Sequence, residues 1–99
     1  MARFDVYKNP DGAGYLLDIQ ADLLSHLNSR VVVPLMPSSA APVPARGLNP
    51  VFRIAGKDAV MVTQFMAAVP TTALRTAVTN LEAKRNEIVS AIDLLMQGF

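Results

Sequence analysis

The sequence predicts an α+β domain that is mainly β, with short strands first and one long helix last. Three observations support this class: segments of alternating apolar and polar residues, loops rich in proline and glycine, and a single amphipathic stretch near the C-terminus. The chain has 99 residues, enough for one hydrophobic core, so we expect a single domain over residues 1–99.

Two alternating segments near the N-terminus predict a β-hairpin. Arg3 to Lys8 places Phe4 and Val6 on one face of a strand, and Tyr15 to Ala21 alternates in the same way. The connection from Asn9 to Gly14 contains asparagine, proline, aspartate and glycine, which are turn-forming residues. We therefore expect an antiparallel pair joined by this loop.

A buried strand and a proline-rich loop are predicted in the middle of the chain. Val31 to Val33 is β-branched on both faces, as in a central strand, and Pro34 is expected to end that strand. The segment from Pro37 to Pro50 has four prolines in fourteen residues and is expected to be a mobile loop.

A second hairpin is predicted around Ala55-Gly56-Lys57. The flanking strands are Val51 to Ile54 and Asp58 to Thr63. Their alternation predicts that Phe52 and Ile54 lie opposite Val60 and Val62.

The last third of the chain predicts one long helix, from Thr79 to Asp93. Pro70 closes the last strand-like stretch, and Thr72 to Val78 is expected to form a turn or two of helix. Thr79 and Glu82 have the spacing of a capping box. The apolar stripe expected to face the sheet contains Leu81, Ile88, Ala91, Ile92 and Leu95.

The last six residues, Leu94 to Phe99, place apolar side chains and a glycine at a chain end, where solvent exposure is the default. Leu94 and Met96 lie off the helix stripe, so packing against the chain's own sheet does not require them. We expect this tail to dock on a partner. The alternative is that Met96 and Phe99 fold back to cap the chain's own core.

Composition favours self-association and argues against several classes of function. Hydrophobic residues make up 52% of the chain and charged residues 17%, against roughly 25% charged in soluble domains, so a homodimer is expected. Nine Lys and Arg nearly balance eight Asp and Glu, which disfavours non-specific nucleic-acid binding by a basic face. With no cysteine, no apolar run of ~18 residues and no signal-peptide pattern, we expect a cytoplasmic protein without membrane contact.

No motif for catalysis, a cofactor or a metal ion is found. His26 is the only histidine and is interpreted as a surface residue in a turn. Asp18 and Asp22, at a strand end, are expected to be solvated. Arg30 and Arg53, on or beside strands, could contact a phosphate but are more typical of paired or surface-lying arginines.

Six blocks of sequence share their order and spacing with one known family. They are Phe4 to Tyr7, Asp18 to Leu24, Arg30 to Leu35, Asn49 to Gly56, Met61 to Pro70, and Arg85 to Leu95. Over essentially its full length, the chain resembles the CcdB family of toxins from bacterial toxin–antitoxin modules, which poison DNA gyrase.

The resemblance implies an SH3-like antiparallel β-sheet or barrel with a long C-terminal helix, a fold shared with the Kid and MazF toxins. It also implies a homodimer whose helix ends enter between two gyrase A subunits and trap the cleaved gyrase–DNA complex. The implied gyrase-binding residues are Leu23, Leu24, Asp93, Met96, Gln97, Gly98 and Phe99. The best-known members end in Trp-Gly-Ile, whereas this chain ends in Gln97-Gly98-Phe99, so the aromatic anchor is absent or has moved to Phe99.

A CcdA-like antitoxin is the second implied partner, and DNA is contacted only through it, in transcriptional corepression. We expect a largely disordered antitoxin segment to bind across the dimer, with contacts at Tyr7, Lys8, Asn9 and Tyr15. Two alternatives stay open. One is an endoribonuclease of the Kid or MazF kind, using Arg53, or Arg30 with Asp18. The other is a relative that does not poison gyrase and acts only as an antitoxin-binding corepressor.

Overall fold

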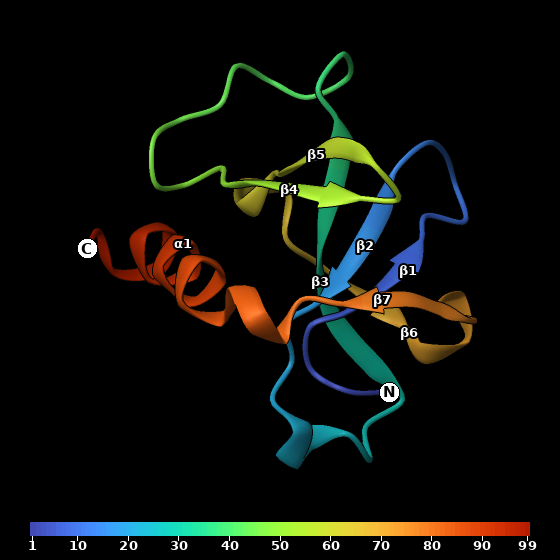
Figure 1. The fold of residues 1–99 in the computed structure, drawn as a ribbon. Helices are drawn as coiled ribbons and strands as arrows, with labels where there is room; N and C mark the ends of the chain where they lie inside the picture. The colour runs from blue at the N-terminus through green and yellow to red at the C-terminus, as the bar shows by residue number, and fades with distance from the viewer.

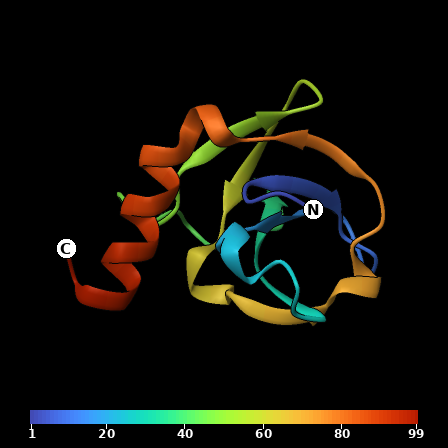
Figure 2. The same ribbon diagram turned by 90° about the horizontal axis from the view of Figure 1, so that it is seen from below.

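Seven short strands form one curled antiparallel sheet, and a single helix follows them along one side (Figures 1 and 2). This computed structural model describes all residues, 1–99. The strands are β1 (Asp5–Lys8), β2 (Tyr15–Asp18), β3 (Ser29–Pro37), β4 (Val51–Ile54), β5 (Lys57–Met61), β6 (Ala67–Pro70) and β7 (Ala77–Asn80). The helix is α1 (Arg85–Gln97), and four 3-10 turns are η1 (Asp22–Leu24), η2 (Thr63–Phe65), η3 (Thr71–Ala73) and η4 (Glu82–Lys84). The predicted fold class is confirmed.

The strand order is β4-β5-β3-β2-β1-β7, and β6 pairs with the first part of β3. In this order, β4 and β7 each have a neighbour on one side only. The sheet is therefore a half-barrel whose opening lies between β4 and β7 (Figure 1). We call this opening the seam.

The first hairpin forms as predicted, with Val6 opposite Leu17 and Lys8 opposite Tyr15. Gly14 closes its loop with φ of 89°, in the left-handed region. A Cβ at this position would overlap the carbonyl oxygen of Leu35 on β3. Glycine is therefore required for β2 to enter the sheet at this distance from β3.

The strand at Val31 to Val33 is central, as predicted, but Pro34 does not end it. β3 continues to Pro37 because its neighbour on one side changes from β6, which pairs with Ser29–Val32, to β5, which pairs with Leu35–Pro37. The Pro34 carbonyl accepts a bond from the Val62 N–H on that side. Pro34 has no backbone N–H. Because the N–H and C=O of a strand residue point to the same side, the missing N–H lies on the side where the partner of β3 changes from β6 to β5.

The second hairpin is confirmed, but its predicted register is wrong. Ala55 and Gly56 alone form the turn, with φ of 52° and 80°, as in the two-residue turns that favour hairpins. Lys57 therefore already belongs to β5 and lies opposite Ile54, which places Phe52 opposite Ala59. Val60 lies opposite Val51 instead.

The prediction for residues 72–81 is wrong. Within this range only the end of η3 (Thr71–Ala73) is helical, and Ala77–Asn80 is a strand that pairs with β1. Thr79 lies in that strand and makes no capping bond; the Asn80 side chain accepts the Glu82 N–H at 2.8 Å instead. The ladder to β1 outweighs the local capping signal, so the α-helix begins only at Arg85.

The main core lies between the curled sheet and α1. It comprises Phe4, Val6, Leu17, Ile19, Val33, Leu35, Phe52, Ile54, Ala59, Met61, Leu81, Ile88 and Ala91. Of the predicted helix stripe, Leu81, Ile88 and Ala91 are buried and Ile92 is half-buried, whereas Leu95 is 37% exposed. A smaller cluster on the other sheet face contains Tyr7, Leu16, Val32 and Leu74.

No regular structure forms between Pro37 and Val51, as predicted for the proline-rich loop. Its C-terminal end is anchored by buried Asn49, whose amide donates to the Met61 carbonyl at 3.0 Å and to the Gln64 side chain at 2.8 Å. None of the helices combines the length and apolar character that a membrane crossing requires.

Candidate functional site

The C-terminal end of α1 carries exposed apolar side chains. Met96 is 62% exposed and Phe99 is 81% exposed. Gly98 adopts φ of 81° and its N–H donates to the Leu94 carbonyl at 3.0 Å, which is the usual glycine helix cap. The alternative in which Met96 and Phe99 cap the chain's own core is therefore wrong. The tail extends into solvent from a rigid helix.

The remaining tail residues lie at the same end. Gln97 is exposed, and its side-chain amide donates to Asp93 at 3.5 Å. Asp93 itself is half-buried on the preceding turn of the helix.

Leu23 and Leu24 lie on η1, with 86% and 42% of their surface exposed. Two side chains hold this turn in place. The Gln20 amide donates to the carbonyls of Leu24 and Ser29 at 3.1 and 3.2 Å, and the Asp22 carboxylate accepts the Arg3 N–H at 2.7 Å. The two leucines are thus presented to solvent by an ordered loop.

Beneath this loop lies a buried ion pair that the sequence did not predict. Asp18 and Arg30 are both fully buried, and Arg30 Nη2 lies 2.7 Å from Asp18 Oδ2. Asp18 also accepts the Gln20 N–H at 3.0 Å. Burial raises the pKa of the Asp18 carboxyl, and the bonds from Arg30 and Gln20 oppose this rise. The expectation of a solvated Asp18 is wrong, whereas Asp22 is exposed as expected.

The structure does not bring all the implied gyrase-binding residues together in one protomer. η1 and the C-terminus lie apart in both ribbon views (Figures 1 and 2). Between them η2 packs against α1, and its Phe65 is 50% exposed. Phe65 was missed from the sequence because it follows a buried strand and reads as a core residue.

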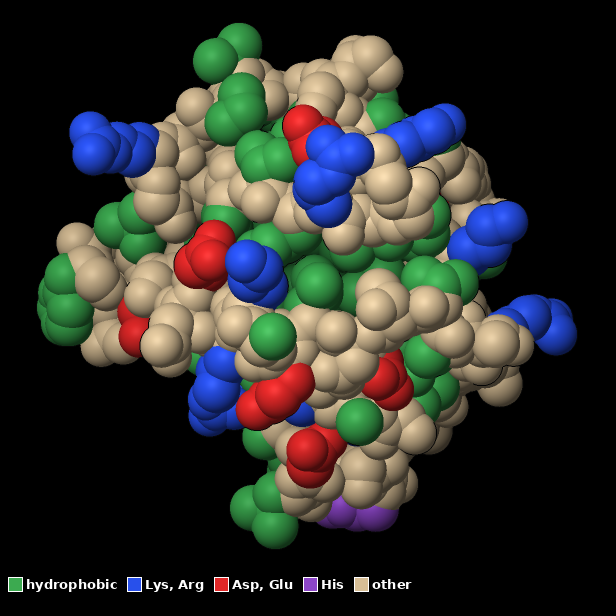
Figure 3. Space-filling view, in the orientation of Figure 1, with side chains coloured by type: hydrophobic (Ala, Val, Ile, Leu, Met, Phe, Trp, Pro, Cys, Tyr) green, Lys and Arg blue, Asp and Glu red, His purple; other side chains and the backbone are tan.

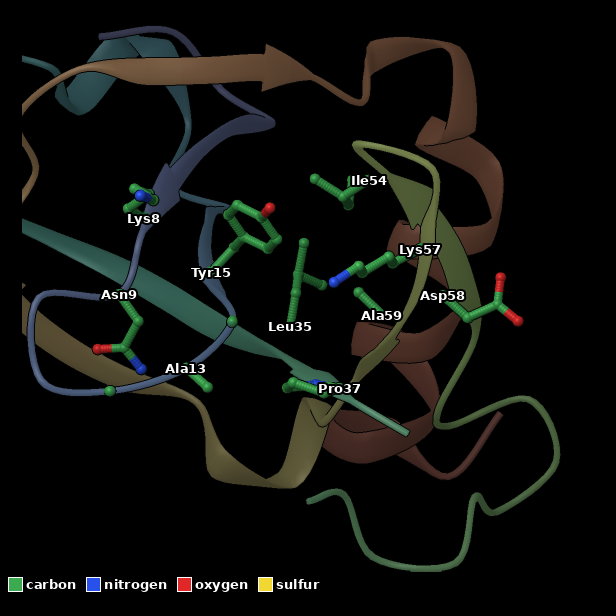
Figure 4. Close-up of a pocket in the computed structure, with 12 residues that line it drawn as sticks. Lys8, Asn9, Ala13, Tyr15, Leu35, Pro37, Ile54, Lys57, Asp58 and Ala59 are labelled. Carbon is green, nitrogen blue, oxygen red and sulfur yellow. The ribbon is translucent and has the colours of Figure 1, made fainter. Parts of the chain in front are cut away.

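The residues expected to bind antitoxin divide between the two faces of the sheet. Neighbouring strand residues point to opposite faces, so Tyr7 is buried in the smaller cluster while Lys8 faces the seam. Lys8, Asn9 and Tyr15 line a cavity of about 470 Å³ between the β1–β2 loop and the β4–β5 hairpin (Figure 4). Its other walls include Leu35, Ile54 and Lys57.

The rim of this cavity is basic. Figure 4 shows the Lys57 side chain pointing over the cavity and the Asp58 carboxylate pointing away from it. Asp58 pairs with Arg53 at 3.2 Å on the exposed surface of the hairpin. In Figure 3, apolar surface fills a hollow in this face, and Lys and Arg side chains border it.

The candidate catalytic residues, Arg53 and Arg30 with Asp18, have different environments. Arg30 and Asp18 have no exposed surface, so they cannot contact an RNA substrate in this conformation. Arg53 and Asp58 are accessible and paired. His26 is exposed, as interpreted from the sequence, and no three His, Cys, Asp or Glu side chains come together as metal ligands.

Comparison with known proteins identifies the family. Residues 3–98 match the CcdB protein family. The chain therefore belongs to the CcdB family, and the resemblance found in the sequence is confirmed.

The fold is also similar to that of a solved endoribonuclease, in complex with its cognate antitoxin, from a mycobacterial species. The TM-score is 0.79 with 15% sequence identity, and the match covers 97% of this chain and 94% of that chain. At this identity, the similarity shows a shared fold.

Proposed function

We propose that this chain is the toxin of a type II toxin–antitoxin module. In this proposal it inhibits DNA gyrase by trapping the cleaved DNA–gyrase complex, and a CcdA-like antitoxin neutralises it. Membership of the CcdB family supports this role. The observation that carries the gyrase step is the exposed tail, in which Met96 and Phe99 extend from the end of α1.

The proposed gyrase contact uses two tails, one from each subunit of a homodimer. In a single protomer η1, which carries Leu23 and Leu24, lies apart from the C-terminal end of the chain (Figure 1). Pairing of two protomers through the apolar surface around Phe65 would put two helix ends into one assembly. Gyrase A, itself a symmetric pair, would then be contacted by both ends.

Phe99 is the proposed aromatic anchor. A buried aromatic side chain at an interface centre commonly contributes ~2 kcal/mol or more, about thirtyfold in affinity. Phe99 is free to enter such a pocket because 81% of its surface is exposed. The αL conformation at Gly98 redirects the chain away from the helix axis.

The antitoxin is proposed to bind at Lys8, Asn9 and Tyr15, which line the cavity beside the seam. Tyr7 would act from below, as a buried support for the strand that carries Lys8. DNA would be contacted only through the antitoxin, when the complex represses transcription.

The test is induced expression in bacteria without antitoxin, scoring growth arrest and covalent gyrase–DNA complexes. Deletion of Gly98 and Phe99 should abolish both effects while leaving the melting temperature nearly unchanged, because these residues lie outside the core. Gln97→Trp should strengthen poisoning, since it adds a rigid aromatic group beside Phe99. Val43→Ala is the matched control, because Val43 is 91% exposed on the proline-rich loop.

Other outcomes would identify the alternatives. A folded deletion variant that remained fully toxic would contradict the role of the tail. RNA cleavage by the purified protein alone would support the endoribonuclease alternative, with Arg53 and Asp58 as the accessible pair. If the protein repressed transcription together with the antitoxin but caused no growth arrest, only the corepressor alternative would remain.

A further inference from the structure

At the seam, the sheet leaves backbone groups unpaired. β4 pairs only with β5, and β7 pairs only with β1. An exposed sheet edge is a template on which an extended peptide can add as a strand. The β7 edge is irregular because its pairing with β1 shifts register between Val6 and Tyr7. β4 has an uninterrupted register with β5, so it is the better template.

The turn geometry determines which β4 groups face the seam. In a two-residue hairpin, the residues that flank the turn exchange both backbone hydrogen bonds, and bonded pairs then alternate along the ladder. Ile54 and Lys57 flank the turn, so Ile54 and Phe52 bond to β5. The N–H and C=O groups of Val51 and Arg53 consequently point to the open edge.

Adjoining cavities lie beside this edge. The 470 Å³ cavity shares Lys8, Tyr15 and Ile54 with a second cavity of about 340 Å³, which reaches Val78 and Thr79 on β7. Together they extend across the seam from the β1–β2 loop to both edge strands. Tyr15, Leu35 and Ile54 give the space an apolar floor.

The charges around the seam complement an acidic ligand. Lys8 and Lys57 line the larger cavity, and Arg75 lines a third cavity of about 300 Å³ that also contains Lys8. None of these three cations has a carboxylate within ion-pair distance. Asp58 is the only acidic lining residue and points away (Figure 4); Asp11, in the β1–β2 loop, does not line any of these cavities.

We propose that an extended, acidic segment of the antitoxin adds as a strand to β4 in the seam. Side chains alternate along a strand, so apolar residues of the segment would pack inward on Tyr15 and Ile54. Its carboxylates would meet Lys8, Lys57 and Arg75. This inference rests on the proposed function, because it takes the antitoxin as the source of the segment. It adds how the segment binds and which of its chemical groups the toxin recognises.

Amide hydrogen exchange of the toxin, free and bound to the purified full-length antitoxin of its module, tests the backbone pairing. The N–H groups of Val51 and Arg53 should exchange at least ~10-fold more slowly in the complex. Phe52 and Ile54, already bonded to β5, serve as internal references and should change less. Protection confined to α1 or to β7 would overturn the proposal.

Substitutions separate the backbone contribution from the charges. Val51→Pro removes an edge N–H and should weaken antitoxin binding ~10-fold, whereas Val51→Thr keeps that N–H and should bind normally. Lys57→Glu with Arg75→Glu should weaken binding ~100-fold at low salt, and less at high salt. Arg46→Glu, a cation outside the seam that also lacks an ion pair, is the matched charge control and should have no effect.

Growth arrest without antitoxin is measured for every variant. Toxicity retained by all of them, together with equal antitoxin affinities, would overturn the seam proposal and leave the proposed function intact. A wild-type chain that causes no growth arrest contradicts the gyrase function instead.

Discussion

Single residues in this fold acquire their properties from neighbours distant in the sequence. Arg30 and Asp18 are twelve residues apart, yet adjacent strands place them on one face, where both are fully buried. Arg30 Nη1 has no hydrogen-bond partner there. A buried pair of this kind contributes little net stability, but removing one partner leaves an uncompensated charge. It also holds the loop of Leu23 and Leu24, since Arg30 donates to the Gln20 carbonyl at 3.5 Å.

Tyr7 is expected to make stability depend on pH in the alkaline range. Burial, then the nearby Asp5 and Asp18 charges, raises the Tyr7 pKa from 10.0 to about 12. The folded state therefore keeps this proton where the unfolded state loses it. This contribution to the free energy of unfolding is complete below pH 10. It amounts to about 2–3 kcal/mol and is lost as the pH rises toward 12.

Urea unfolding between pH 8 and pH 12 measures this effect. The wild-type free energy of unfolding should fall more steeply above pH 10 than that of Tyr7→Phe, which has no phenol to ionise. Parallel pH profiles for the two proteins would show that Tyr7 is solvated in the folded state.

At the scale of elements, local signals predicted the turns better than the ends of strands and helices. The loop at Asn9 to Gly14 and the turn at Ala55-Gly56 contain residues that favour turns. Each of them connects the two strands of a hairpin. β7 was missed because Ala77–Asn80 is exposed along its length and has no alternating pattern. Its strand conformation comes from pairing with β1, and the local sequence carries no signal for that pairing.

The two ends of the predicted helix stripe should differ in their contribution to stability. Ile88 is completely buried, so Ile88→Ala should lower the free energy of unfolding by about 2–5 kcal/mol. Leu95 is 37% exposed, and Leu95→Ala should cost less than about 1 kcal/mol. Chemical denaturation of both variants measures the difference. Equal losses would mean that another surface covers Leu95.

At the scale of the whole molecule, two surfaces lack a partner within the chain. One is the seam, and the other is the apolar surface around η1, η2 and the end of α1. The tail could be predicted from sequence because chain ends are exposed by default. The seam could not, since its lining residues come from the β1–β2 loop, the β4–β5 hairpin and β7. Only the strand order brings these segments together.

The apolar surface predicts a stable homodimer. Leu27, after η1, is 41% exposed, and Phe65 on η2 is 50% exposed. Ala67 and Ala68 on β6 are also exposed, and η2 packs directly against α1. A chain with 52% hydrophobic residues hides such a surface most readily against a second copy of itself.

Light scattering at micromolar concentration should therefore give about twice the 10.6 kDa chain mass. Phe65→Asp should shift the protein toward monomer, because it places an unpaired charge in the proposed contact, where desolvation is costly. Val43→Asp introduces the same charge at a 91% exposed site outside that surface and should remain dimeric. Both substitutions lie outside the core, so both variants should fold. A wild-type monomer under these conditions would contradict the dimer and also the gyrase proposal, because that mechanism requires two helix ends in one assembly.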